Sequence, residues 1–331
     1  MDILLVKPGA EEFAIADCKR REIEVDFFDQ GILMRNVHTA QGSSDECFPF
    51  WICYDVFEID LKVSTNGIET VSNWFCQEIK EKRFEESWPL IWLSSSDNGF
   101  TLDLSKADRI KEKLKKRISR ITKLADTSYP QIDKRVTGLF IAESKSSKKL
   151  FVSREAVFFG QRRMKDDPLA PSRSYLKIEE AFTIFDFSPK PGEIVVDLGA
   201  APGGWTWAAL KRGATVYAID NGPLKNGPLG HPNVHHIRED AFTWQPKNIP
   251  IDWLFCDVVE QPQKVFDTIK IWFKNGWCKF AIINFKYGYS NPGAVMELIY
   301  NQKGLIPYSQ KLTCRHLFHD RDEITVMVKI Q

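Results

Sequence analysis

The sequence lacks any long uninterrupted run of apolar residues, and it has no clear excess of one charge. No window of its 331 residues approaches 18 apolar residues in succession, so a transmembrane span is not expected. The opening stretch MDILLVKPGAEEF has no basic segment followed by an apolar core, which argues against a secretory signal. Lys and Arg number 45 against 44 Asp and Glu, so total charge gives no indication about nucleic-acid binding.

Paired cysteine motifs are also missing. The seven cysteines are odd in number, scattered along the chain and never spaced as C-x-x-C, which argues against a disulfide framework and against a zinc site. Reduced thiols in a cytoplasmic protein fit this pattern better. Residues 315–323, RHLFHDRDE, group two histidines with several acids, but such clusters are mostly polar loops, and no bound metal is expected.

The second half of the chain alternates strand-like and helix-like segments. A helical stretch at 176–185 precedes the first of these strands, and a second helix is expected at 265–277. This alternation predicts an α/β, Rossmann-like, mainly parallel sheet, in which 322–330 is a candidate antiparallel last strand. The strand-like runs are 193–199, 214–220, 233–240, 251–257 and 279–286.

The first half of the chain predicts a smaller α+β region of mixed short strands and helices. A basic, proline-bearing connector at 160–174 separates the halves, so the expected domains are 1–160 and 161–331. Within the first, residues 106–123 carry nine Lys and Arg against two acids, and their apolar residues recur at helical spacing. This basic helix is either a solvated surface or a surface that tracks phosphates.

The stretch DLGAAPGGWTW at 197–207 forms a small, bare turn directly after a predicted strand. A phosphate-binding P-loop requires lysine after its last glycine, but Trp205 follows Gly204 here. A dinucleotide loop requires the spacing G-x-G-x-x-G, which Gly199 and the pair Gly203 and Gly204 do not have. Both phosphate-site interpretations are therefore weakened.

A site for the methyl donor S-adenosyl-L-methionine suits these residues better. The donor carries a sulfonium and an ammonium, so its site requires a carboxylate near the first strand, and Asp197 provides one. Bare backbone in GAAPGG can lie against the ligand. Asp220 ends the second strand, where an acid can accept the two ribose hydroxyls, and Asp240 follows the third, where an acid can receive the adenine amino group.

Four further charged residues are expected at the same edge of the sheet. Asp257 ends the fourth strand and Lys286 ends the fifth, after six mostly apolar residues. Lys177 opens the helix before the motif strand, and Glu323 opens the last strand. A lysine that ends a buried strand can simply reach solvent. If the sheet is doubly wound, however, all four side chains meet at its carboxyl edge.

These four residues resemble the K-D-K-E tetrad of FtsJ-like RNA 2′-O-ribose methyltransferases. Over residues 170–328, about half the chain, the sequence resembles more closely the RlmM family, which methylates large-subunit (23S) ribosomal RNA. One departure is Ala201, where relatives can carry Cys; either small residue leaves the backbone contact intact. The blocks that carry the resemblance are APSRSYLKIEEAF, VDLGAAPGGWTW, IDNGP, REDAF, CDVVEQPQKV, NGWC, NFK and HDRDEITV.

The resemblance implies an N-terminal RNA-binding region with a THUMP domain, and residues 1–160 are compatible with one in length and position. It also implies a cytidine of ribosomal RNA as the target. The donor site that it implies consists of Ser174, Ala201, Pro202, Gly203, Gly204, Asp220, Asp240 and Asp257.

In the implied reaction, Lys286 deprotonates a ribose 2′-hydroxyl, whose oxygen then attacks the donor methyl in line. Lys177, Asp257 and Glu323 surround this base. A neighbouring ammonium and the sulfonium both disfavour a charged Lys286, while the two carboxylates are expected mainly to orient the lysines.

Three alternatives remain at this stage. The chain could be a non-catalytic RNA-binding protein on a methyltransferase scaffold, but such a protein would be expected to lose tetrad residues. It could be a small-molecule methyltransferase, which would need neither the tetrad nor the basic helix. It could also be a 2′-O-methyltransferase that acts on another RNA.

Overall fold

The computed structural model describes residues 1–35, 46–63, 66–79, 84–97, 99–247, 249–288, 292–301 and 303–331. The chain forms two compact units, Met1–Gly160 and Gln161–Gln331. The sequence pattern also predicts a helix at 68–83, whose last residues, 80–83, lie outside the described part. No helix in the part of the chain that the structure describes is long and apolar enough to cross a membrane.

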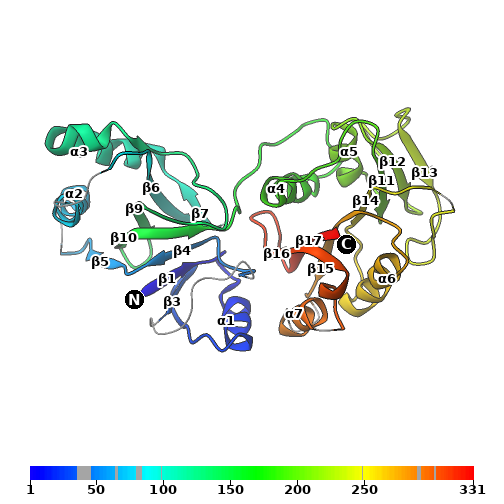
Figure 1. Ribbon diagram of the computed structural model, residues 1–331, viewed down its shortest axis with the longest axis horizontal. Helices are drawn as coiled ribbons and strands as arrows, with labels where there is room; N and C mark the ends of the chain where they lie inside the picture. The colour runs from blue at the N-terminus through cyan, green and yellow to red at the C-terminus, as the bar shows by residue number, and fades with distance from the viewer. Residues whose placement is uncertain are drawn as a thin grey trace. The chain divides into compact units, whose positions relative to one another are not determined.

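The first unit is built on one large, mostly antiparallel sheet (Figure 1). Its strand order is β2-β3-β1-β4-β10-β9-β6-β7, with β5 paired to β10 and β8 paired to β6. Its elements are β1 (Asp2–Leu5), α1 (Glu11–Arg20), β2 (Asp26–Asp29), β3 (Ile32–Arg35), β4 (Trp51–Tyr54), β5 (Phe57–Asp60), α2 (Gly67–Glu78), β6 (Trp88–Ser96), β7 (Gly99–Leu102), α3 (Leu104–Thr122), β8 (Ala125–Asp126), β9 (Arg135–Ser144) and β10 (Lys149–Phe158).

The basic helix expected at 106–123 is α3, and its apolar stripe packs into the core of the first unit. Asp103 caps the helix, because its side chain accepts a hydrogen bond from the backbone N–H of Lys106. Ile110 and Leu114 are fully buried against β6 and α2. The charged residues are therefore confined to the remaining helix surface.

The second unit is a seven-stranded sheet in the order β13-β12-β11-β14-β15-β17-β16. The first five strands in this order, β13, β12, β11, β14 and β15, pair in parallel. Strand β17 runs antiparallel to β15, as expected for the last strand. The α/β fold class is thus confirmed. The elements are α4 (Tyr175–Phe185), β11 (Ile194–Leu198), α5 (Gly204–Leu210), β12 (Thr215–Ile219), β13 (Val234–Ile237), β14 (Trp253–Cys256), α6 (Pro262–Lys274), β15 (Phe280–Lys286), α7 (Pro292–Tyr300), a 3₁₀ turn (Ile306–Tyr308), β16 (Ser309–Arg315) and β17 (Glu323–Ile330).

Helices cover both faces of this sheet, as a parallel sheet requires (Figure 1). Helices α4 and α5 pack together on one face, and α6 and α7 lie on the other. On the α4–α5 face, Phe182, Trp205 and Ala208 share a core with Phe255 and Ile282 of the sheet. This packing fixes the carboxyl ends of β11, β12, β14 and β15 along one edge.

Candidate active site

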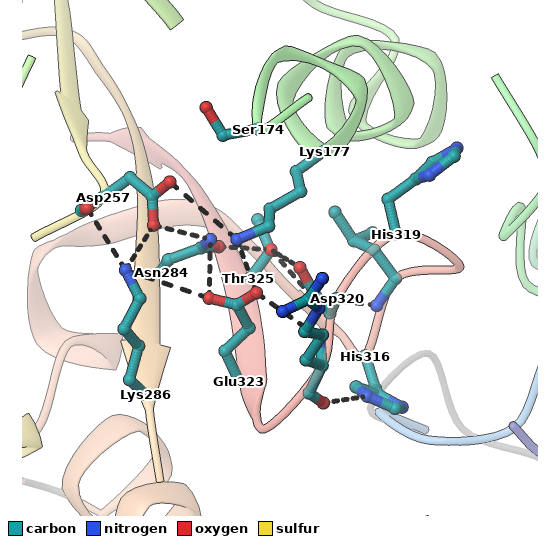
Figure 2. A network of polar contacts seen from close by, with 12 residues as sticks. Ser174, Lys177, Asp257, Asn284, Lys286, His316, His319, Asp320, Glu323 and Thr325 are labelled. Carbon is teal, nitrogen blue, oxygen red and sulfur yellow. Dashed lines mark hydrogen bonds and ion pairs between the residues drawn. The ribbon is translucent and has the colours of Figure 1, made fainter. Parts of the chain in front are cut away.

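The four charged residues predicted for one edge of the sheet lie together there (Figure 2). Lys286 is the last residue of β15, and Asp257 directly follows β14. Glu323 is the first residue of β17, and Lys177 stands in the first turn of α4. Because β17 runs against β15, its beginning rather than its end reaches the carboxyl edge.

The pairing of β15 with β17 sets four polar side chains on one face. Lys286 is the register partner of Glu323, and Asn284 is the register partner of Thr325. Since alternate residues of a strand point to the same face, these two pairs form a block of four neighbouring side chains.

The ammonium nitrogen of Lys286 donates hydrogen bonds to three oxygens. Nζ donates to Asp257 Oδ1 at 2.7 Å, to the Asp257 carbonyl at 3.2 Å and to the Val258 carbonyl at 3.3 Å. Glu323 Oε2 lies 3.9 Å from the same nitrogen. The side chain keeps 24% of its surface exposed, so its nitrogen is both oriented by the protein and reachable from solvent.

Lys177 is more deeply placed and binds both carboxylates from the opposite side. Its Nζ lies 2.5 Å from Glu323 Oε1 and 3.8 Å from Asp257 Oδ2, and its side chain is 13% exposed. Burial acts to lower the pKa of Lys177, but the charges of Asp257 and Glu323 outweigh burial and raise it. Lys177 therefore stays a cation that neutralises the pair of carboxylates.

Two residues not singled out in the sequence, Asn284 and Thr325, complete the cluster behind these charges together with Asp320 of the acidic loop at 315–323. Asn284 Nδ2 donates to Asp257 Oδ1 at 3.1 Å and lies 3.4 Å from Glu323 Oε2. Thr325 Oγ1 lies 2.5 Å from Asn284 Oδ1 and 3.1 Å from Asp320 Oδ2. Asn284, Thr325 and Asp320 all have no exposed surface. The available signal for Asn284 and Thr325 was their polarity inside the apolar runs FAIINFK and EITVMV.

The loop between β11 and α5 brings bare backbone to the same edge of the sheet. Gly203 has a φ of 109°, a conformation that disfavours every residue with a side chain. A Cβ atom on Gly199 would lie 2.4 Å from the Val258 side chain. A Cβ on Gly204 would lie 2.4 Å from Ser174 Oγ and 2.5 Å from Ser172 Oγ, so both hydroxyls rest against this glycine.

Asp220 and Asp240 lie where the sequence places them, after β12 and β13. Asp220 Oδ2 accepts a hydrogen bond from the Ala201 N–H at 3.0 Å, and Oδ1 accepts one from the Gly222 N–H at 2.7 Å. The carbonyl of Pro202 accepts from the Lys225 N–H, which ties the loop to the next crossover. Asp240 is exposed, and its Oδ1 accepts from the Phe242 N–H at 2.9 Å.

Asp197 differs from the other acids because its carboxylate lies in the interior. It is 1% exposed, and its Oδ2 accepts a hydrogen bond from Thr206 Oγ1 at 2.6 Å. Burial raises the pKa of Asp197 to about 7, although the Thr206 hydrogen bond acts in the opposite direction. Through this hydrogen bond to Thr206, the carboxyl group of Asp197 fixes the first turn of α5, which follows the loop.

The two tryptophans of the motif have different surroundings. Trp205 is 2% exposed within the core, and its Nε1 donates to the Ser174 carbonyl. Trp207 is only partly buried, and its Nε1 donates to Asp167 Oδ2 at 3.0 Å. Gly227 lies against the Trp207 ring, since a Cβ there would come within 2.4 Å of it.

The histidine and aspartate cluster at 315–323 forms a braced loop. His319 Nε2 accepts from the Met164 N–H at 2.9 Å, and His316 Nε2 lies 2.9 Å from the Arg321 carbonyl. Glu180, a fully buried residue of α4 that was not singled out in the sequence, accepts from the backbone N–H groups of Phe318 and His319. Within the described ranges, no group of three metal-binding side chains gathers in this loop or elsewhere.

Comparison with known proteins agrees with this geometry. Residues 170–299 match the family model of FtsJ-like methyltransferases. The matched residues all lie within the second unit. The loop at 199–204 and the cluster around Lys286 all belong to this unit.

Two curated relatives are both named Ribosomal RNA large subunit methyltransferase M. The one from Laribacter hongkongensis is 42% identical over 167 residues, which cover 47% of this chain and 47% of the relative. The one from Shewanella oneidensis is 43% identical over 184 residues, which cover 51% of this chain and 50% of the relative. The chain therefore spans about half the length of the curated relatives it matches.

Proposed function

We propose that the protein transfers a methyl group from S-adenosyl-L-methionine to a ribose 2′-hydroxyl of large-subunit (23S) ribosomal RNA. One observation carries this proposal. A lysine nitrogen, Lys286 Nζ, is held by Asp257 at the carboxyl edge of the sheet, in the same unit as a glycine-rich loop of the FtsJ-like domain. A protein that only binds RNA has no need of an oriented amine beside a bare backbone loop.

The residues of the loop fit a bound S-adenosyl-L-methionine. Asp220 and Asp240 follow successive strands at this edge and supply carboxylate oxygens suited to ribose and adenine donors. We assign donor binding to the segment Ala201–Gly204, Ser174, Asp220, Asp240 and Asp257. Asp197 acts on the donor only through the loop that it braces. When bound, the donor supplies an activated methyl group on a positively charged sulfur, so no metal is required.

Lys286 is the proposed general base. A lysine accepts a proton only in its neutral form, in which the nitrogen has two N–H groups and one lone pair. In that form the two N–H groups would be shared among Asp257 Oδ1 and the carbonyls of Asp257 and Val258, which hold Nζ in place for the incoming hydroxyl. Lys177, which remains charged, balances the carboxylates so that they do not draw a second proton into the cluster. The proton of the 2′-hydroxyl then moves to Lys286 Nζ.

The first unit is the proposed RNA-docking region, with a THUMP-like part and α3 as one contact. Arg109, Lys116 and Arg120 of α3 are exposed. Lys106 and Lys113, in contrast, are paired with Glu143 and Glu69 within the unit. The exposed cations can therefore neutralise phosphates without breaking ion pairs. A substrate of this kind also fits the cytoplasmic location proposed from the cysteines.

The decisive experiment maps ribose 2′-O-methylation in ribosomal RNA from cells with and without the gene. We expect the loss of one methylation, at a cytidine of the large-subunit RNA, and its return with the wild-type gene but not with a Lys286→Ala gene. A signal lost only from transfer RNA would replace the ribosomal substrate with another RNA. An unchanged map, together with salt-sensitive RNA binding by the purified protein, would favour a non-catalytic RNA-binding protein.

A further inference from the structure

Behind the charged cluster, three fully buried polar side chains form a chain of hydrogen bonds. Asp320, Thr325 and Asn284 are each 0% exposed, and they connect in this order (Figure 2). The last of them contacts the carboxylates of Asp257 and Glu323. None of the three can touch a substrate, so any effect on the reaction must pass through these two carboxylates.

The direction of the chain follows from the amide of Asn284. Ionised carboxylates only accept hydrogen bonds, so the NH₂ group of Asn284 must face Asp257 Oδ1 and Glu323 Oε2. The carbonyl oxygen Oδ1 must then face Thr325, whose Oγ1 lies 2.5 Å away. An amide oxygen only accepts, so the hydroxyl proton of Thr325 points to Asn284.

The same reasoning places a proton on Asp320. A threonine hydroxyl has a single proton, and Thr325 gives it to Asn284. Thr325 Oγ1 lies 3.1 Å from Asp320 Oδ2 and 3.4 Å from Oδ1, and this contact is then favourable only if the carboxyl group of Asp320 is the donor. Because Oδ2 accepts a hydrogen bond from the Leu317 N–H at 2.9 Å, the proton is assigned to Oδ1. The geometry thus assigns a protonated carboxylic acid to the buried end of the chain.

The surroundings of Asp320 favour its neutral form. Burial is the largest influence and the nearby charge of Glu323 adds to it, whereas Lys177 and the backbone N–H of Leu317 oppose them; together they raise the pKa of Asp320 to about 8. Glu180 on α4 is a further acid close to Asp320. A third negative charge beside Glu323 and Asp257 would exceed the two positive charges of the lysines.

We propose that protonated Asp320, Thr325 and Asn284 act as positioning residues, forming a one-way hydrogen-bond chain that fixes the carboxylates of Asp257 and Glu323 against the two lysines. This inference rests on the proposed methyltransferase function and adds three residues to its site. Through Asn284, the chain supplies one N–H to each carboxylate. It thereby fixes the direction from which Asp257 holds Lys286.

A matched pair of variants at Thr325 tests the chain. Thr325→Val removes the hydroxyl and keeps the shape, whereas Thr325→Ser keeps the hydroxyl and removes a methyl group. We expect Thr325→Val to lower kcat by about tenfold to a hundredfold, because the carboxylates lose their fixed direction. Thr325→Ser should retain kcat to within about threefold. The dissociation constant of S-adenosyl-L-methionine, measured by calorimetry, should change little in both variants.

Variants of Asp320 test whether its carboxyl group carries a proton. In Asp320→Asn, an amide nitrogen in the place of Oδ1 can donate to Thr325, while the amide oxygen in the place of Oδ2 accepts from Leu317, as the protonated acid does. We expect this variant to keep kcat near that of the wild type and to lose the decline in rate that ionisation of Asp320 causes above about pH 8. Asp320→Ala, which can donate nothing, should resemble Thr325→Val.

The outcomes separate this inference from the proposed function. If the wild-type protein transfers no methyl group to ribosomal RNA, the proposed function fails. If the wild type is active, two results would contradict the proposed hydrogen-bond chain. One is a Thr325→Val kcat equal to that of the wild type, and the other is an Asp320→Asn kcat as low as that of Asp320→Ala. An Asp320→Asn protein that does not fold, judged by circular dichroism, would also overturn it, because the neutral isostere should be accepted.

Discussion

Glu323 bridges the two lysines of the cluster, with Oε1 lying 2.5 Å from Lys177 Nζ and Oε2 lying 3.9 Å from Lys286 Nζ. Each oxygen of one carboxylate therefore faces a different cation. Lys177 is 13% exposed and Lys286 is 24% exposed, so the outer lysine is the one that a substrate can reach. This asymmetry supports the proposed role of Lys286 as the base and of Lys177 as a lasting positive charge.

Replacement of Lys286 should separate catalysis from donor binding. Lys286→Ala removes the base, and Lys286→Arg replaces it with a group that cannot lose a proton in a protein, so both should abolish methyl transfer. Calorimetry should show S-adenosyl-L-methionine binding within about threefold of the wild type, because Lys286 is not assigned to the donor site. Near-normal turnover by either variant would show that another group accepts the proton.

Replacement of Lys177 should cost stability as well as activity. Lys177→Met keeps the length of the side chain but leaves Glu323, which is 6% exposed, without its nearest cation. Loss of one partner of a buried ion pair should lower the free energy of unfolding by about 3 kcal/mol. Denaturant unfolding measures this change. The double variant Lys177→Met/Glu323→Gln should recover most of it, and no recovery would mean that the pair is not the cause.

Asp320 should make stability depend on pH. Its folded pKa of about 8 lies above the ordinary value of 3.8, so between these values the native protein keeps a proton that the unfolded chain has released. The contribution is complete below about pH 4 and is lost as the pH rises through about 8, by at most about 1.4 kcal/mol per pH unit. Denaturant melts at several pH values should give a flatter profile for Asp320→Asn than for the wild type. Parallel profiles for the two proteins would mean that Asp320 is ionised in the native protein.

The packing of Gly204 against two serine hydroxyls predicts that its substitution is harmful. Gly204→Ala would bring Cβ within 2.5 Å of Ser172 Oγ and Ser174 Oγ, which themselves lie 2.7 Å apart. Displacement of both hydroxyls should lower stability by about 1–3 kcal/mol and weaken donor binding. Thermal melts and calorimetry measure the two effects. Adding Ser172→Ala and Ser174→Ala should restore stability but not donor affinity, and unchanged donor affinity in Gly204→Ala would remove this contact from the donor site.

Exposed and paired cations of α3 should differ in their effect on RNA affinity. Lys116→Gln and Arg120→Gln should each reduce the slope of log K against log salt by about 0.7–0.9, because each removes one proposed phosphate contact. Lys113→Gln is the matched control, since Lys113 pairs with Glu69 in the folded unit, and it should change the slope less. Equal slopes for all variants and the wild type would mean that the RNA does not contact these residues of α3.

Much of the second unit could be predicted from its sequence because its signals are local. The apolar runs that became β11, β12, β14 and β15 lie close to their expected positions, and the helix expected at 176–185 is α4. In a parallel sheet, the end of each strand is also its position at the ligand-binding edge, so residues such as Asp257 and Lys286 could be placed from the chain order alone.

What the sequence could not indicate depends on pairing and burial. That Asn284 faces Thr325 requires the register of β15 and β17, which joins residues 41 positions apart. The interior position of Asp197 depends on Thr206 reaching it from α5. In the first unit, short strands such as β2 and β8 have little pattern of their own and are defined by their sheet neighbours.

The register of β15 and β17 has a consequence for folding itself. If β17 slipped by one residue, Glu323 would turn to the opposite layer, and Ile324, which is fully buried, would enter the polar cluster beside Lys286. Charges forced into an apolar layer without partners carry a penalty of several kcal/mol, so the misaligned sheet is strongly disfavoured. The polar side chains of the proposed active site thus also specify the register in which β15 and β17 pair.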